Sequence, residues 1–154
     1  MYKSKLITFV EEKFDILETV LILVLLASSI LMMNTITYSL RCIQGSLILL
    51  ALLYFLMALR PFEGKVAGLR IVVRRVVYIS FVLGCLTTMS VFSFDEDVDV
   101  HKLIIATLVF LGLSFVSLLL LRYKMKIKER TFGLFLRCAI FTAVLVWLLI
   151  MHNA

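Results

Sequence analysis

Residues 60–75 read RPFEGKVAGLRIVVRR, and this stretch decides how the rest of the chain is organised. It contains the only proline of the sequence, Pro61, and five basic residues, and long apolar segments lie on both sides of it. Proline interrupts a helix, and the glycines that follow it here weaken one further. The stretch therefore predicts a polar connection between two apolar helices.

The composition is typical of a membrane protein. Of the 154 residues, 63% are hydrophobic, and the mean hydropathy is +1.12, whereas soluble domains are roughly 45–50% apolar. The apolar residues occur in blocks nearly free of charge, and about 20 such residues suffice to cross a bilayer. We predict an all-α integral membrane protein, a compact bundle of about five transmembrane helices that forms a single domain over residues 1–154.

The apolar blocks predict five spans, and a different pattern precedes the first. The predicted spans are residues 17–34, 40–59, 75–94, 102–121 and 132–151. In residues 2–16, Leu6, Val10 and Phe14 recur every four residues while charged residues lie on the other side. This pattern predicts an amphipathic helix lying in the membrane interface. A cleaved signal peptide is disfavoured, because acidic residues are unusual in its first region.

Basic residues gather in two of the connections and indicate how the chain is oriented. The other two connections contain only Arg41 and Lys102. The basic residues of the two rich connections are Arg60, Lys65, Arg70, Arg74, Arg75, Arg122, Lys124, Lys126, Lys128 and Arg130. Because basic connections stay in the cytoplasm, we predict a cytoplasmic N-terminus and an external C-terminus, in a bacterial inner (plasma) membrane. Tyr54 and Tyr78 then fall at the inner boundary.

The same basic residues are predicted to contact anionic lipid headgroups or an acidic partner protein, since each basic residue near a membrane surface contributes about 1 kcal/mol. The net charge of +6 is explained by topology, so we predict no nucleic-acid partner. A voltage sensor is disfavoured because Arg70, Arg74 and Arg75 stop at the entrance of their span instead of repeating through it.

Small residues predict close helix contacts. Ser80, Gly84 and Thr88 recur at intervals of four, and small residues let helix backbones approach closely in lipid. Gly112 is predicted to pack in the same way in the next span. Thr107 and Ser114 lie on a different side of that span. The small-residue faces can serve packing within the bundle or the docking of another helix.

Charged residues inside the spans are few. Glu18 and Arg137 lie at similar predicted depth near the cytoplasmic side, which predicts an ion pair, although Arg137 can also extend to the headgroups. None of the predicted spans has an Asp or Glu near its middle. This absence disfavours an ion-coupled transporter, because such proteins use acidic residues at membrane depth.

The remaining residues do not form a recognised catalytic arrangement. Asp95, Asp97, Asp99 and His101 alternate and form a weak candidate cation site, but the glycine and late glutamate of an EF-hand loop are missing. We predict no cofactor and a solvated acidic connection. The three cysteines follow no metal or redox spacing, and no nucleophile has a recognisable base, so we predict no enzymatic activity.

Two functions fit this sequence. The first is a non-catalytic accessory, scaffold or regulatory subunit, which contacts another membrane protein through its helices and basic cytoplasmic connections. The second is a channel, pore or small transporter made of several copies of the chain, lined by the Ser and Thr faces of spans three and four.

Overall fold

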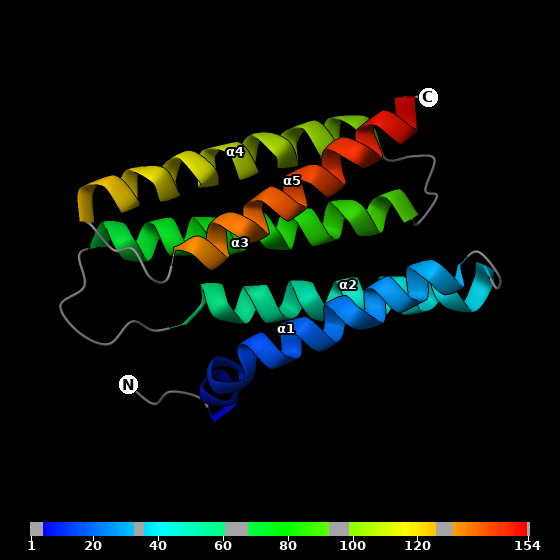
Figure 1. The fold of residues 1–154 in the computed structure, drawn as a ribbon, viewed down its shortest axis with the longest axis horizontal. Helices are drawn as coiled ribbons and strands as arrows, with labels where there is room; N and C mark the ends of the chain where they lie inside the picture. Colours follow the sequence, from blue (N-terminus) through cyan, green and yellow to red (C-terminus); the bar gives the residue numbers. More distant parts are fainter. Residues whose placement is uncertain (1–4, 33–35, 61–67, 93–98, 126–130, 154) are drawn as a thin grey trace.

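The computed structural model describes residues 5–32, 36–60, 68–92, 99–125 and 131–153 (Figure 1). The described residues form five long α-helices, which confirms the prediction of an all-helical fold. These helices are α1 (Lys5–Leu31), α2 (Ile36–Ala58), α3 (Gly68–Phe92), α4 (Val100–Met125) and α5 (Phe132–Asn153).

The helices lie side by side along the long axis of the molecule and alternate in direction, so the two termini lie at opposite ends (Figure 1). The helix α3 is central, because it packs against α2, α4 and α5. The helix α4 also packs against α5. Within the described part of the chain, α2 is the one helix whose backbone lies close to the backbone of α1. The starts of α1, α3 and α5 and the ends of α2 and α4 therefore share one end of the bundle (Figure 1).

Among the described helices, four are long and apolar enough to cross a membrane, and their composition suggests a membrane location. The four stretches are Ile7–Leu31, Tyr38–Ala58, Val100–Tyr123 and Phe132–Met151. Large hydrophobic side chains such as Leu23, Ile30 and Leu113 are exposed along these helices. Contiguous apolar surface of this kind is rare on soluble monomers.

The helix α3 is not among these four stretches. It begins with three arginines and carries several hydroxyl side chains. Ser80, Thr87 and Thr88 of α3 are buried in the bundle. The central position of α3 explains these hydroxyl groups, because Ser80, Thr87 and Thr88 are buried between it and its neighbours.

The separate interfacial helix that the sequence predicted over residues 2–16 is not present in the described residues. The helix α1 runs without interruption from Lys5 to Leu31, because this segment contains neither glycine nor proline to break it. The apolar side predicted there exists, but Val10 and Phe14 pack into the core, where they are 7% and 6% exposed. The pattern that we assigned to the membrane interface is therefore a helix–helix contact.

Two pairs of hydroxyl side chains join α3 to α4. The Ser80 and Ser114 hydroxyl oxygens lie 2.6 Å apart, and those of Thr87 and Thr107 lie 2.7 Å apart. Residues seven apart lie on the same side of a helix, so the two pairs form successive rungs of one antiparallel contact. All four side chains are at most 2% exposed.

This contact corrects one prediction about helix packing. The Thr107 and Ser114 side of α4 faces α3, so the opposite side of α4 is turned away. Gly112 is exposed on that outer side, and a Cβ atom added there would meet nothing within 4 Å in the described structure. Gly112 therefore makes no close helix contact within the described bundle, which excludes internal packing at this residue and leaves the docking of another helix as a prediction. The sequence could not show which side of α4 faces inward, because α4 is apolar on nearly all sides.

The two small residues Gly84 and Ser80 face different helices. Ser80 contacts α4, whereas a Cβ atom at Gly84 would lie 2.8 Å from Cδ1 of Phe141 in α5. Thr88 is buried and donates its hydroxyl to the Gly84 carbonyl oxygen at 2.8 Å. Gly84 therefore permits the close approach of α5 to α3.

We expect Gly84→Leu to destabilise the protein by about 1–3 kcal/mol, the usual effect of inserting methylenes into a packed core. Thermal unfolding in a mild detergent measures the change. Leu83→Ile, one position round the helix, is the control and should have a small effect. Combining Gly84→Leu with Phe141→Ala should recover part of the loss. A Gly84→Leu variant as stable as the wild-type chain would contradict the close contact.

Candidate functional site

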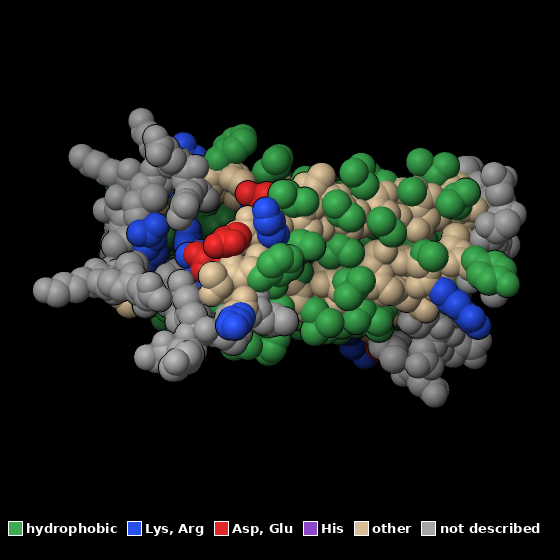
Figure 2. Space-filling view, turned by 90° about the horizontal axis from the view of Figure 1, so that it is seen from below, with side chains coloured by type: hydrophobic (Ala, Val, Ile, Leu, Met, Phe, Trp, Pro, Cys, Tyr) green, Lys and Arg blue, Asp and Glu red, His purple; other side chains and the backbone are tan. Residues whose placement is uncertain are grey.

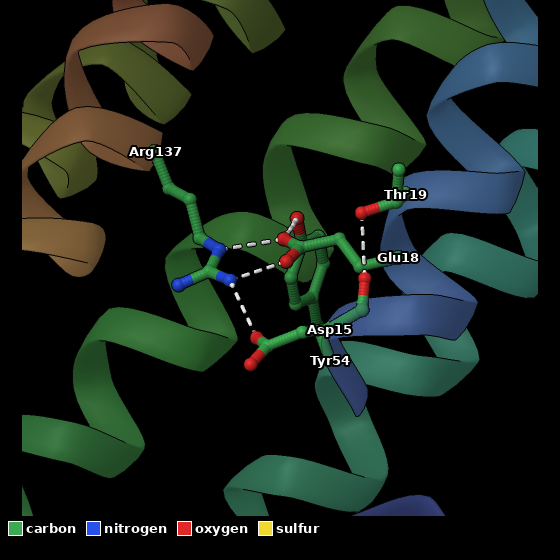
Figure 3. Close-up of polar contacts among 5 residues, drawn as sticks. All are labelled: Asp15, Glu18, Thr19, Tyr54 and Arg137. Carbon is green, nitrogen blue, oxygen red and sulfur yellow. Dashed lines mark hydrogen bonds and ion pairs between the residues drawn. The ribbon is translucent and has the colours of Figure 1, made fainter. Parts of the chain in front are cut away.

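Glu18 of α1 and Arg137 of α5 form a bidentate ion pair inside the bundle (Figure 3). The Nε atom of Arg137 donates to Oε1 of Glu18 at 2.6 Å, and its Nη2 atom donates to Oε2. The same Nη2 atom lies 3.4 Å from Oδ1 of Asp15. Bidentate arginine–carboxylate pairs combine charge attraction with a fixed geometry. The structure thus brings together the two residues that the sequence predicted to pair.

A third side chain forms a hydrogen bond with the Glu18 carboxylate. The hydroxyl of Tyr54 in α2 donates to Oε1 of Glu18 at 2.6 Å (Figure 3). Glu18 is only 5% exposed and Tyr54 only 1%. A buried carboxylate is stable only when charge and hydrogen bonds replace its lost water, and here α5 and α2 supply these groups.

The ion pair bridges two helices whose backbones do not approach each other within the described residues. The long side chain of Arg137 crosses this gap from α5 to α1. Its guanidinium carbon lies 5.3 Å from the centre of the Phe14 ring, which adds a cation–π contact. Phe14 and Glu18 are four residues apart, so both project from the same side of α1.

A cluster of aromatic rings lies next to the ion pair. Neighbouring ring centres are 5.2–6.3 Å apart, within the range that aromatic pairs prefer. The cluster consists of Phe14, Tyr54, Tyr78, Phe81 and Phe141. Four helices contribute to it, so it joins α1, α2, α3 and α5 on the apolar side of the pair.

The aromatic cluster changes the interpretation of two tyrosines. We predicted Tyr54 and Tyr78 at the inner membrane boundary. The structure shows that both belong to the packing of the bundle: Tyr54 is a core residue bonded to Glu18, and Tyr78 packs edge-on against Phe81. Tyr38 and Tyr123, by contrast, are 78% and 89% exposed.

A cavity of about 470 Å³ opens beside the ion pair, between α1, α3, α5 and the end of α2. Figure 2 shows acidic and basic side chains gathered around a hollow near one end, with hydrophobic side chains beyond it. The charged residues that line the cavity are Glu11, Glu12, Asp15, Arg60, Arg74 and Arg137. Arg60 forms an ion pair with Glu11, and each of these two side chains is 24% exposed. The cavity is therefore a polar site with both signs of charge.

The basic residues predicted to contact lipid or a partner differ in their burial at this end of the bundle. Arg60 and Arg74 line the cavity, Arg70 is half-buried, and Arg75 and Arg122 are exposed. The remaining members of the predicted set lie outside the described part of the chain or have side chains outside it. These are Lys65, Lys124, Lys126, Lys128 and Arg130.

Asp99 of the weak cation site has a structural role. Its Oδ1 atom accepts a hydrogen bond from the backbone N–H of Lys102 at 3.3 Å, and its Oδ2 atom lies 2.6 Å from Lys102 Nζ. Asp99 therefore caps the start of α4. The hydrogen bonds from Lys102 lower the pKa of the Asp99 carboxyl below its usual value.

The other residues of the predicted cation site are only partly within the described chain. Asp95 and Asp97 lie outside the described residues, and His101 is half-buried at the start of α4. Within the described ranges, no three His, Cys, Asp or Glu side chains are grouped in a way that could hold a metal ion.

Comparisons of the chain with protein-family models, curated proteins and solved structures found no match. Function is therefore inferred from the chemistry of the site.

Sequence reasoning missed several residues of the site, among them Phe14, Asp15 and Tyr54. Phe14 was visible through its spacing with Leu6 and Val10, but we read that spacing as an interfacial pattern. Tyr54 gave no comparable signal in the sequence, because its bond to Glu18 depends on how α2 packs against α1.

We expect Arg137→Gln to be more destabilising than Glu18→Gln. Removing one partner of a buried ion pair costs about 3–5 kcal/mol when a charge is left unpaired. Arg137→Gln leaves the Glu18 carboxylate at 5% exposure, whereas Glu18→Gln leaves an arginine that still contacts Asp15 and the open cavity. Thermal unfolding in detergent measures both variants.

The double variant Glu18→Gln, Arg137→Gln tests whether the two residues are coupled. We expect it to be less destabilised than the sum of the single variants, because neither charge is then left alone. Strict additivity would mean that Arg137 acts independently of Glu18. Lys13→Gln is the control and should have little effect, since Lys13 is exposed on α1 and lies outside the described lining of the cavity.

Proposed function

We propose that this chain is a non-catalytic membrane subunit with five spans that supports or regulates a larger membrane assembly. The observation that carries the proposal is the internal pairing of polar side chains. Glu18 pairs with Arg137 and Tyr54, while the hydroxyl groups of α3 pair with those of α4. The outer surface left by this pairing is apolar along the helices and charged toward the ends of the bundle. Such a surface suits contact with lipid and with other proteins.

The proposal includes α3 as a fifth span. It has 25 residues, which at 1.5 Å per residue make it about 37 Å long. Its position between α2, α4 and α5 supports this, because polar side chains at membrane depth are tolerated where they face a bundle interior. An odd number of spans also agrees with termini at opposite ends of the molecule (Figure 1).

The internal hydroxyl pairs favour this proposal over a pore made of several copies. The Ser and Thr side chains suggested as a pore lining, such as Ser80 and Thr107, face each other within one chain and are at most 2% exposed. They would have to separate before they could contact water in a channel. A pore built on these faces would therefore need a different packing of α3 and α4.

Purification in a mild detergent tests the subunit proposal. We expect the chain to be recovered with at least one different membrane protein, and we expect recovery to fall when charge at the basic end is reversed by Arg75→Glu. Arg41→Gln, which changes an exposed arginine near the start of α2, is the control and should not affect recovery. A symmetric ring of this chain alone, with ion flux in vesicles, would support the pore instead.

Cysteine labelling tests the proposed orientation, in which the N-terminus is cytoplasmic. The native residues Cys42, Cys85 and Cys138 are first replaced by alanine, and single probes are placed at Val98 and Ile127. Because basic connections stay in the cytoplasm, an impermeant reagent added to intact cells should label the probe at Val98 only. Labelling at Ile127 in sealed cells would reverse the orientation.

A further inference from the structure

We propose that the Arg137 side chain is a gate between the charged cavity and the buried carboxylate of Glu18. In the closed arrangement, which is the one in the structure, the guanidinium pairs with Glu18 and covers it. In the open arrangement the guanidinium pairs with Asp15 alone, and Glu18 faces the cavity. This inference goes beyond the proposed function and depends only on the geometry of the bundle.

The guanidinium of Arg137 lies between the cavity and the buried carboxylate. Arg137 belongs to the lining of the cavity, whereas Glu18 and Tyr54 are not part of the described lining. Glu18 is 5% exposed and Tyr54 is 1% exposed, although Arg137 donates directly to Glu18 at 2.6 Å. The guanidinium therefore forms the wall that separates Glu18 from the open space of the cavity.

Asp15 offers the guanidinium a second acceptor on the cavity side. Its Oδ1 atom lies 3.4 Å from Nη2 of Arg137, the same atom that donates to Glu18 (Figure 3). Asp15 lines the cavity, and its side chain is 91% exposed, whereas the side chain of Glu18 is 7% exposed. Residues three apart are neighbours on a helix surface. The guanidinium thus has an inner and an outer carboxylate within reach, and it keeps an ion pair in both arrangements.

The surroundings of the guanidinium leave room for this change. Gly133 lines the cavity and precedes Arg137 by four residues, so both lie on the same side of α5. A Cβ atom at Gly133 would lie 3.2 Å from Nη1 of Arg137, and the absence of that atom leaves space beside the guanidinium. The Phe14 ring also lines the cavity, 5.3 Å from the guanidinium carbon. A cation–π contact with this ring therefore remains available as the guanidinium moves.

The two arrangements differ in free energy because Glu18 is buried. When Arg137 pairs with Asp15 alone, Glu18 keeps the hydrogen bond from Tyr54 but loses its positive partner. A buried carboxylate without a cation is unfavourable, so the open arrangement is a minor state, and such states have populations of roughly 0.1–10%. The gate also decides whether α1 and α5 are joined inside the bundle, through Glu18, or at its surface, through Asp15.

Carboxyl labelling of the full chain in detergent tests the gate. A water-soluble carbodiimide together with glycinamide converts accessible carboxyl groups to amides, and peptide mass spectrometry gives the labelling rate at each residue. We expect slow labelling of Glu18 in the wild-type chain. Asp15→Asn should lower the rate at Glu18 about tenfold, because one charge-assisted hydrogen bond supports the open arrangement. Arg137→Gln removes the gate and should raise the rate at least about tenfold, because the open state is at most about 10% populated.

Glu12→Gln is the matched control. Glu12 is another exposed carboxylate that lines the cavity, so this variant removes the same charge as Asp15→Asn from the same space. It should leave the labelling rate of Glu18 unchanged. The comparison of these two variants does not require the Arg137→Gln variant to fold.

Several results would overturn the gate. An increased rate at Glu18 in Asp15→Asn would mean that labelling proceeds through local unfolding, and an unchanged rate would mean that Asp15 is not the outer partner. Equal decreases in Asp15→Asn and Glu12→Gln would assign the effect to the charge of the cavity. Absence of labelling at Glu18 in the wild-type chain, when Glu12 reacts completely, would mean that the path stays closed.

Discussion

The structure depends on the neutralisation of one carboxylate. Glu18 lies inside the bundle, and the desolvation penalty of an ion in a low-dielectric interior is several kcal/mol. Its partners come from α5 and α2, in the form of Arg137 and Tyr54. The first helix of the chain is therefore linked to the last by charge and to the second by a hydrogen bond.

The polar contacts of the bundle differ in kind according to their position along the helices. Neutral hydroxyl pairs join α3 to α4 in their middle sections, at Thr87 with Thr107 and at Ser80 with Ser114. The ion pair that joins α1 to α5 lies nearer the opposite end of α3, where Arg137 remains 23% exposed and borders the open cavity. This distribution follows from desolvation, because a neutral hydroxyl loses less hydration free energy than a charged group when it leaves water.

The sequence predicted the all-helical fold and the pairing of Glu18 with Arg137, because apolar length and charge depth are properties of a single segment. It could not predict which side of each helix faces inward. In α4, the Gly112 side and the Thr107–Ser114 side were equally plausible as the side that contacts α3, because apolar residues surround both. Lipid is as apolar as a protein core, so hydrophobicity does not distinguish a lipid-facing side from a buried one. The same ambiguity applied to Val10 and Phe14, because an apolar stripe on a helix can face a membrane interface or a neighbouring helix.

The ion pair and the cavity follow from one geometric feature. Within the described residues, α1 packs against α2 but not against α5, so a gap remains between the first and last helices at one end. An apolar side chain of ordinary length would not reach across it, whereas the long side chain of Arg137 does. Such a bridge fills only part of the gap, and the space beside it is the cavity lined by Asp15 and Arg74. A tighter contact between α1 and α5 would remove the cavity and leave no space for the arginine, so the fold that stabilises Glu18 also creates the site.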